Sequence, residues 1–236
     1  MIFSKALIGF IGLIYILFVG FEFFGDNSIA LKISVLIIPL IALLYFISVE
    51  KRTLFFSLFL ICYSIPELML FLKNEIVYET YYYICNTLSV TAYVFLLIEI
   101  YKSINFNEVL KKFKTQVIVL TFLSFYMAYV LFKIMSPYLI VSIEYFLEIS
   151  YNVLILLVLS VSLLNYFYKD DKKSLFLFLG ALCIVFSEVI NVAYLYIANE
   201  NALNFMFVSL FVLAFYFLYQ QSKLDDEVDE NLMLKS

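Results

Sequence analysis

The chain has 236 residues, of which 65% are hydrophobic and 14% are charged, with a mean hydropathy of +1.03. This composition lies outside the range of soluble globular proteins and indicates a polytopic membrane protein. The net charge of −4 comes mainly from the acidic stretch Asp225–Glu230, and the lysines are dispersed over short loops, so we expect no nucleic-acid partner.

Eight apolar segments, each near the roughly 20 residues that a helix needs to cross the hydrocarbon core, follow one another along the chain. They cover residues 6–24, 29–48, 53–72, 77–100, 116–134, 143–167, 174–198 and 202–221. The first is long for the apolar region of a signal peptide and is not followed by a small-residue cleavage site, so we expect it to be retained.

The runs within these segments are apolar on every side, as in "VLIIPLIALLYFI", whereas strands of a membrane barrel alternate apolar and polar residues. The sequence therefore predicts an all-α polytopic membrane protein with eight transmembrane helices. We expect one transmembrane domain over residues 1–221 and an acidic cytoplasmic tail over residues 222–236.

The basic residues predict the orientation of the helices, because cytoplasmic loops are enriched in Lys and Arg. If these eight segments cross the membrane in turn, 12 basic residues at or beyond their ends fall on one side and 3 on the other. The minority is Lys32, Lys73 and Lys133. We therefore expect both termini to be cytoplasmic, in an integral protein of a bacterial plasma membrane.

Two of the predicted helices carry a carboxylic acid well inside the apolar run. Glu67 lies in "FSLFLICYSIPELMLFL" and Glu188 in "FLGALCIVFSEVINVAYLYI", and each follows a cysteine by five residues. This doubling suggests a parallel internal repeat of four plus four helices. The segments Ala92–Leu96 and Ala214–Leu218 also resemble each other, but chance is the alternative for this match, because the chain holds 27 Phe and 20 Tyr.

Other polar side chains of the predicted helices should turn with these acids toward the bundle interior, because lipid cannot satisfy them. Tyr63 and Ser64 share a helix face with Glu67, and Asn191 shares one with Glu188. The candidate substrate-binding side chains are Tyr63, Ser64, Tyr93, Tyr151, Asn152, Ser187 and Asn191.

The remaining acids of the apolar segments are Glu22, Glu99, Glu144 and Glu148, which lie near predicted interfaces. We expect these to contact water or lipid headgroups. The chain has no histidine, no phosphate-binding glycine loop and no nucleophile elbow, so we expect neither a metal site nor a cofactor. The three cysteines lie within predicted helices, where packing is their expected role.

A buried carboxyl without a cationic partner favours its neutral form, and two carboxyls close together separate into one acid and one base. Glu67 and Glu188 are therefore candidate catalytic residues for acid-catalysed cleavage of an acetal-like or enol ether bond. A transporter that binds a proton or cation with the same acids remains an alternative, as do purely structural hydrogen bonds and a non-catalytic membrane sensor.

The chain also resembles the YhhN-like family of eight-helix membrane proteins, which includes the lysoplasmalogenases. The resemblance lies in Phe56-Ser57 with Pro66-Glu67 in one helix, and in Gly180-Ala181 with Phe186-Ser187-Glu188 in another. Lys32, Pro39 and the closing "FYFLYQQ" add to it. This chain has glutamates where the family motifs have aspartates. It also has Val90 where the family's fourth helix typically has a histidine, if Tyr93 is the tyrosine that follows that histidine.

The resemblance implies hydrolysis of the vinyl ether bond of a lysoplasmalogen, which gives a fatty aldehyde and a glycerophospho compound. One carboxylic acid would protonate the vinyl carbon, and the second would stabilise the cation and activate water. The implied partner is a membrane lipid, with a lysophospholipid as substrate. The sequence indicates no oligomeric state.

Overall fold

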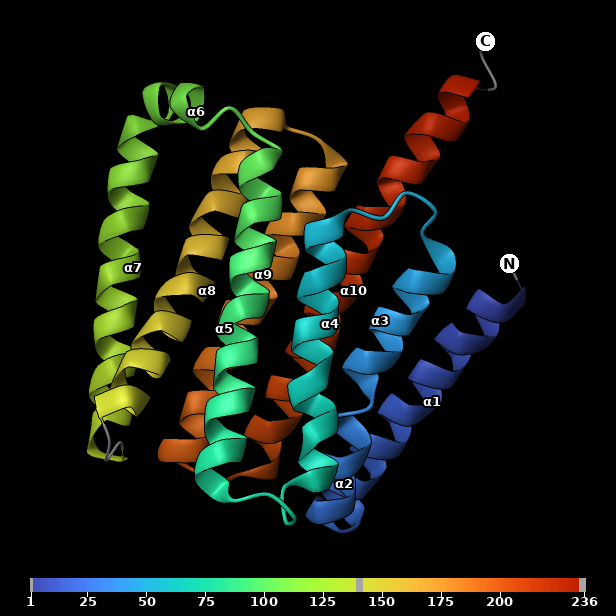
Figure 1. The fold of residues 1–236 in the computed structure, drawn as a ribbon, viewed down its shortest axis with the longest axis vertical. Coiled ribbons are helices and arrows are strands. Elements are labelled where there is room, and N and C mark those ends of the chain that lie inside the picture. The colour runs from blue at the N-terminus through green and yellow to red at the C-terminus, as the bar shows by residue number, and fades with distance from the viewer. Residues whose placement is uncertain (1, 139–141, 234–236) are drawn as a thin grey trace.

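The computed structural model describes the backbone of residues 2–138 and 142–233, and the side chains of residues 3–138 and 143–224. Within these residues the chain is helical and has no strand, in agreement with the predicted all-α fold. The elements, shown in Figure 1, are α1 (Ile2–Phe24), α2 (Asn27–Ser34), α3 (Ile37–Ser48), α4 (Leu54–Met69), η1 (Leu70–Leu72), α5 (Tyr78–Lys102), α6 (Phe106–Lys112), α7 (Lys114–Met135), η2 (Ser136–Tyr138), α8 (Ser142–Lys169), α9 (Lys172–Tyr196) and α10 (Asn201–Met233).

Eight spans in the described part of the chain are long and apolar enough to cross a membrane, which confirms the predicted integral membrane protein. Their bounds lie within a few residues of those expected, because lipid requires each spanning segment to satisfy its own backbone. They are Phe3–Phe24, Asn27–Ser48, Leu54–Leu72, Tyr78–Lys102, Lys114–Tyr138, Ile143–Lys169, Lys172–Tyr196 and Asn201–Leu224.

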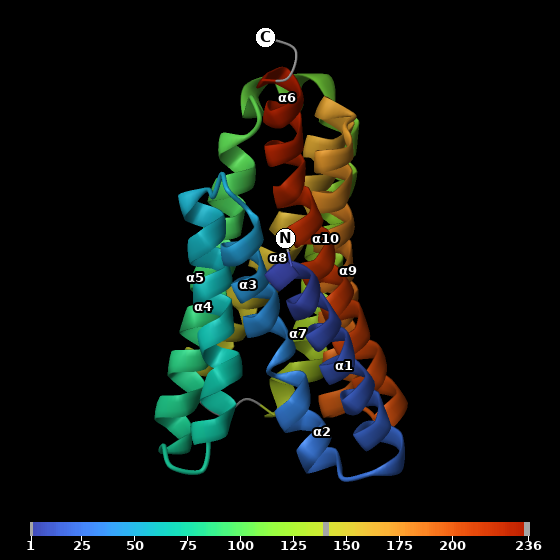
Figure 2. The ribbon, with the colours of Figure 1, turned by 90° about the vertical axis from the view of Figure 1, so that its right-hand side faces the viewer.

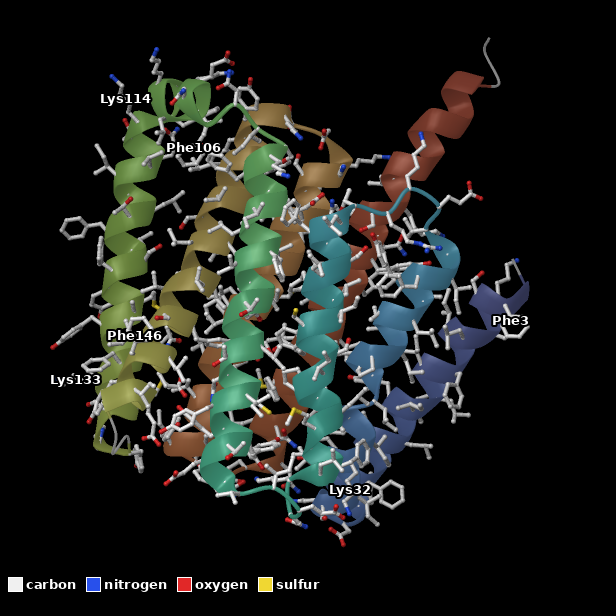
Figure 3. The ribbon with its side chains drawn as sticks, in the orientation of Figure 1. Phe3, Lys32, Phe106, Lys114, Lys133 and Phe146 are labelled. Carbon is white, nitrogen blue, oxygen red and sulfur yellow. The ribbon has the colours of Figure 1, made fainter. Side chains whose placement is uncertain are left out.

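The start of α1 and the last turns of α10 both lie toward the same end of the bundle, which we call the terminal end (Figure 1). Lys32 and Lys133 lie at the opposite end, which we call the distal end, and Lys114 lies at the terminal end (Figure 3). The charged ends and the apolar walls between them fit a protein that crosses a bilayer. The cytoplasmic location of the terminal end stays a prediction from the basic residues.

The second span is broken into α2 and α3, a feature that its continuous apolar pattern does not predict. Val35 and Leu36 follow α2 in a turn, in which the Leu36 N–H bonds to the Ile33 carbonyl at 3.2 Å. Pro39 lies in the first turn of α3 and has no N–H for the carbonyl four residues earlier, that of Val35. The regular α-helical hydrogen bonding is therefore interrupted in the first half of this span, although Val35 and Leu36 keep right-handed helical backbone angles.

The helices form two close pairs, α4 with α5 and α9 with α10, and Figure 2 shows these pairs on opposite sides of the bundle. α8 contacts both α5 and α9 and so joins the pairs. Small residues bring α9 and α10 together: a Cβ at Gly180 would lie 2.9 Å from Leu218 Cγ and 3.2 Å from the Ala214 carbonyl. The suggested four-plus-four repeat stays a prediction.

An aromatic cluster fills the centre where α4, α5 and α10 meet. Phe59 and Phe215 stack with ring centroids 5.6 Å apart, and Tyr63 lies against Phe215 at 5.2 Å. Phe59, Phe215 and Tyr93 are almost completely buried. This cluster forms a buried apolar centre between the three helices.

The last helix continues beyond the boundary expected at residue 221. α10 extends to Met233, so most of the predicted tail continues the helix. The side chains of Asp225–Glu230 and the residues 234–236 lie outside the described part, and the charge pattern of the tail is known from sequence alone.

Candidate functional site

A cavity of about 330 Å³ lies in the distal half of the bundle among α4, α5, α7, α8, α9 and α10. We call it the polar cavity, because most of its lining residues have carboxyl, amide or hydroxyl groups. These are Tyr63, Glu67, Tyr82, Asn86, Ser89, Glu148, Tyr151, Asn152, Glu188, Asn191 and Tyr196. Met135, Val192, Leu195 and Phe207 complete the lining.

Glu188 is the more deeply buried of the two predicted catalytic acids, with 7% of its surface exposed. The Tyr151 hydroxyl of α8 donates to its Oε1 at 2.5 Å, and Asn191 lies beside it one turn along α9. Donors that point at a carboxyl group stabilise its ionised form. Of the two predicted catalytic acids, Glu188 is therefore the one for which side-chain donors favour the carboxylate form.

Glu67 reaches the same cavity from α4 and is partly exposed within it. α4 continues as an α-helix through Pro66 to Met69 and then tightens into η1. Within the described residues the Glu67 side chain makes no hydrogen bond, yet it lies within electrostatic range of Glu188. The two carboxyls thus share one space but have different surroundings.

Three tyrosines form a layer along the wall of the cavity. Tyr93 packs edge-to-face on Tyr151, with centroids 5.5 Å apart, and on Tyr63, with centroids 5.7 Å apart. Tyr63 and Tyr151 line the cavity, whereas Tyr93 lies behind them and is completely buried. The Tyr93 hydroxyl is close to the other two but has no hydrogen bond of good geometry within the described residues.

The structure places four of the seven predicted substrate-binding residues in the lining: Tyr63, Tyr151, Asn152 and Asn191. The other three, Ser64, Tyr93 and Ser187, do not line it. Ser64 donates to the Leu60 carbonyl of its own helix at 2.7 Å, and Ser187 donates to the Phe207 carbonyl of α10 at 2.9 Å. These bonds give both buried hydroxyls a partner within the helix bundle, as buried polar groups require.

Glu148 belongs to the cavity, although the sequence placed it near an interface. It accepts a hydrogen bond from the Tyr82 hydroxyl at 2.9 Å, and its own carbonyl accepts one from the Asn152 amide at 2.9 Å. Its spacing from Tyr151 and Asn152, three and four residues along one helix, places all three on one face. That spacing was the signal that could have identified it.

Glu22 is also buried, with 1% of its surface exposed. The expectation that it contacts water or lipid headgroups is therefore wrong. The Asn204 amide donates to its Oε1 at 2.9 Å, and the Asn201 amide donates to its backbone carbonyl at 2.8 Å. The other carboxyl oxygen, Oε2, has no partner within the described residues. This pair connects α1 to α10, and no local pattern links residues so distant in sequence.

A second, smaller cavity of about 110 Å³ lies beside the first, between the broken span α2–α3, α4 and α10. We call it the apolar cavity. Aliphatic and aromatic side chains line most of it, together with Ser34 and Asn204. Glu67 and Phe207 line both cavities, so these two side chains form the partition between them.

The polar cavity has the means for proton transfer. Three carboxyls line it, and the described lining has no lysine or arginine. Among the described residues, no three His, Cys, Asp or Glu side chains are placed so that they could hold one metal ion. Tyrosine hydroxyls and asparagine amides supply neutral donors, which orient a ligand by hydrogen bonds.

No protein-family model, curated protein or solved structure matches this chain.

Proposed function

We propose that this protein is an intramembrane hydrolase that cleaves the vinyl ether bond of a lysoplasmalogen-type lipid, with Glu67 and Glu188 as its catalytic pair. One observation carries the proposal: both glutamates line one cavity, and Tyr151 donates to only one of them. The resemblance of the sequence motifs to the YhhN-like family supports the same reaction.

The different surroundings of the two acids assign their roles. Glu188 accepts from Tyr151 and acts as the carboxylate. Glu67, without a donor among the described residues, stays protonated and acts as the acid. The arrangement follows the logic of glycosidases, in which two carboxyl groups share the work of one bond cleavage.

The reaction proceeds in three steps. Glu67 first gives its proton to the vinyl carbon remote from oxygen, and the electron pair of the double bond forms the new C–H bond. Glu188 then takes a proton from water, whose oxygen bonds to the oxocarbenium carbon and gives a hemiacetal. Finally, the hemiacetal hydroxyl returns its proton to Glu67, the proton on Glu188 passes to the ether oxygen, and the C–O bond breaks to release aldehyde and alcohol.

The acidic lining also limits how the substrate is placed. The described lining has no cation that would bind a phosphate inside the cavity. We therefore place the glycerol part of the lipid inside and the phosphate beyond the mouth near Leu195, which is 60% exposed. With both termini in the cytoplasm of a bacterial cell, this mouth faces the outer leaflet.

Aldehyde release from purified protein tests the proposal. Wild-type protein should release fatty aldehyde from a lysoplasmalogen but not from the alkyl ether analogue, which has no double bond to protonate. Glu67→Gln and Glu188→Gln should each lower turnover by roughly 10²-fold, the usual loss when general acid–base catalysis is removed. Glu99→Gln is the matched control, because Glu99 lies in a span but does not line the cavity.

A proton- or cation-coupled transporter is the second candidate, favoured by the broken second span and by the position of Glu67 between two cavities. Discontinuous helices beside a buried acid are typical of transporter binding sites. If wild-type protein releases no aldehyde while both Gln variants abolish a proton or cation flux in liposomes, the hydrolase proposal is wrong and the transporter takes its place.

A further inference from the structure

We infer that the apolar cavity is a binding subsite for the hydrocarbon chain of the substrate, so that the junction between chain and headgroup lies at Glu67. This inference rests on the proposed function and specifies which part of the lipid each cavity binds. Its basis is that the lining changes from polar to apolar between the two cavities, which only the Glu67 and Phe207 side chains separate.

The lining of the apolar cavity matches a hydrocarbon ligand. Val208 and Phe211 of α10 face Val35 and Ile38 of the broken span across it, and all four are at least nine-tenths buried. Burying a methylene against such side chains is worth about 0.8 kcal/mol. A polar ligand would find few partners there apart from Glu67, Ser34 and Asn204, and two of these are already engaged: Ser34 donates to the Leu31 carbonyl and Asn204 donates to Glu22.

The partition sets the position of the bond that is cut. Glu67 and Phe207 line both cavities, so a ligand that spans them passes directly by the Glu67 carboxyl. In a vinyl ether lipid, the double bond lies where the hydrocarbon chain joins the polar glycerol. A lipid with its glycerol in the polar cavity and its chain in the apolar cavity therefore presents the double bond to the proposed acid.

The small volume of the apolar cavity does not prevent the binding of a long chain. Leu31, 45% exposed on α2, is part of the lining, so the cavity reaches the lipid-facing surface of the bundle. The first carbons after the ether oxygen would lie inside, and the rest of the chain would continue past Leu31 into the bilayer. The subsite should thus reject chains that are branched near the ether oxygen and accept hydrocarbon chains of any length.

The first test is substrate selectivity in a variant with a smaller subsite. Val208→Phe should lower kcat/KM at least about tenfold for a vinyl ether lipid with a methyl branch near the ether, relative to the unbranched lipid, as expected when an apolar pocket loses room. Val208→Ala should shift the ratio in the opposite direction. Leu213→Phe is the control, because this residue of the same helix is 45% exposed and does not line the cavity.

A second measurement does not require turnover. A lysolipid with a diazirine on a chain carbon close to the ether should label residues 31–38 and 204–212, and excess unlabelled lysolipid should reduce this labelling. Val208→Phe should abolish it, with circular dichroism in detergent as the check on folding.

The outcomes separate the two proposals. Residues 118–129 of α7 carry an exposed apolar surface remote in sequence from the subsite. Labelling of this surface alone, or an equal loss of activity on branched and unbranched lipids in Val208→Phe, would overturn the chain subsite while leaving the hydrolase intact. An absence of aldehyde from wild-type protein with specific labelling of the subsite would overturn the hydrolase and keep a lipid-binding site.

Discussion

At the scale of single residues, Tyr151 is the side chain that distinguishes the two acids. Its hydroxyl donates to Glu188, and its ring packs on Tyr93, which the surrounding aromatic cluster holds in place. The tyrosine is thus a rigid donor, with few rotamers left to it. A donor held in this way favours the ionised form of Glu188, and a carboxylate there would stabilise the positive charge that develops on the oxocarbenium ion.

Tyr151→Phe should keep this packing and remove only the hydroxyl. We expect turnover to fall about tenfold or more, because a hydrogen bond to a charged group contributes roughly 1.5–3 kcal/mol. KM should stay unchanged, since the bond acts on Glu188 rather than on the lipid. Steady-state aldehyde release measures both constants. A variant with wild-type turnover would contradict the assignment of Glu188 as the carboxylate.

The contact between Glu22 and Asn204 makes a second prediction at this scale. Asn204→Leu removes the amide that donates to the buried Glu22 carboxyl, and we expect a loss of about 1–3 kcal/mol in the free energy of unfolding. Thermal unfolding in detergent measures it. Glu22→Leu in the Asn204→Leu background should recover part of the loss, because it removes the buried carboxyl that the first change leaves without its donor.

At the scale of elements, the contact of α9 with α10 depends on a residue without a side chain. Gly180→Ala should cost about 1–3 kcal/mol, since the new methyl group would overlap Leu218 and press on the Ala214 carbonyl. Gly12→Ala in α1 is the control, because a Cβ added there would meet no neighbouring atom within 4 Å, and it should not destabilise. Equal melting temperatures for the two variants would show that α9 and α10 do not pack as closely at Gly180 as its distances to Leu218 and Ala214 indicate.

The start of α9 depends on Asp171, whose side chain accepts from the Ser174 N–H at 2.7 Å. Burial alone would raise the pKa of Asp171, but the hydrogen bonds from Ser174 and the nearby Lys169 and Lys173 lower it below its ordinary value. A carboxyl with a lowered folded-state pKa stabilises the protein above its unfolded-state pKa and loses this contribution as the pH falls through the folded-state pKa.

Asp171→Ala should therefore lower stability by about 1 kcal/mol at neutral pH, as for other helix N-caps. The difference from wild type should shrink as the solution becomes acidic. Asp171→Asn keeps the oxygen that caps the helix but does not titrate in this range, so its stability should not show this acid-dependent decline. Unfolding curves across pH measure all three proteins, and a pH-independent difference for Asp171→Ala would count against the titration.

The elements were predictable because one constraint dominates in lipid: each span must be apolar and must satisfy its own backbone. The break after Ser34 was not predictable, since "KISVLIIPLIALLYF" is apolar throughout and proline, here Pro39, is tolerated within many transmembrane helices. Glu67 and Glu188 were recognisable as acids inside apolar runs. Glu148 was not recognisable in this way, because its depth in the bundle depends on how α8 packs against α5. Helical spacing also could not show that the Ser64 and Ser187 hydroxyls donate to backbone carbonyls.

At the scale of the whole molecule, the three lysines labelled in Figure 3 divide between the two ends. Lys32 and Lys133 lie at the distal end, where the basic minority predicted from the sequence is found, and Lys114 lies at the other (Figure 3). Reporter fusions after Lys114 and Lys173 should report the cytoplasm, and fusions near Lys73 or Asn201 should report the outside. Paired alkaline phosphatase and fluorescent fusions measure this, and a cytoplasmic signal at Asn201 would contradict the orientation.

The partition between the two cavities has a kinetic consequence. The backbone of α10 at Phe207 is held by the hydrogen bond from Ser187, whereas the Phe207 ring and the Glu67 carboxyl face open space on both sides. Rotation of these two side chains would therefore open a path between the cavities without the shift of whole helices, which takes microseconds to milliseconds. A lipid could thread past the acid while the helices stay in place, and the rate of exchange with the bilayer would be set by the ligand rather than by the fold.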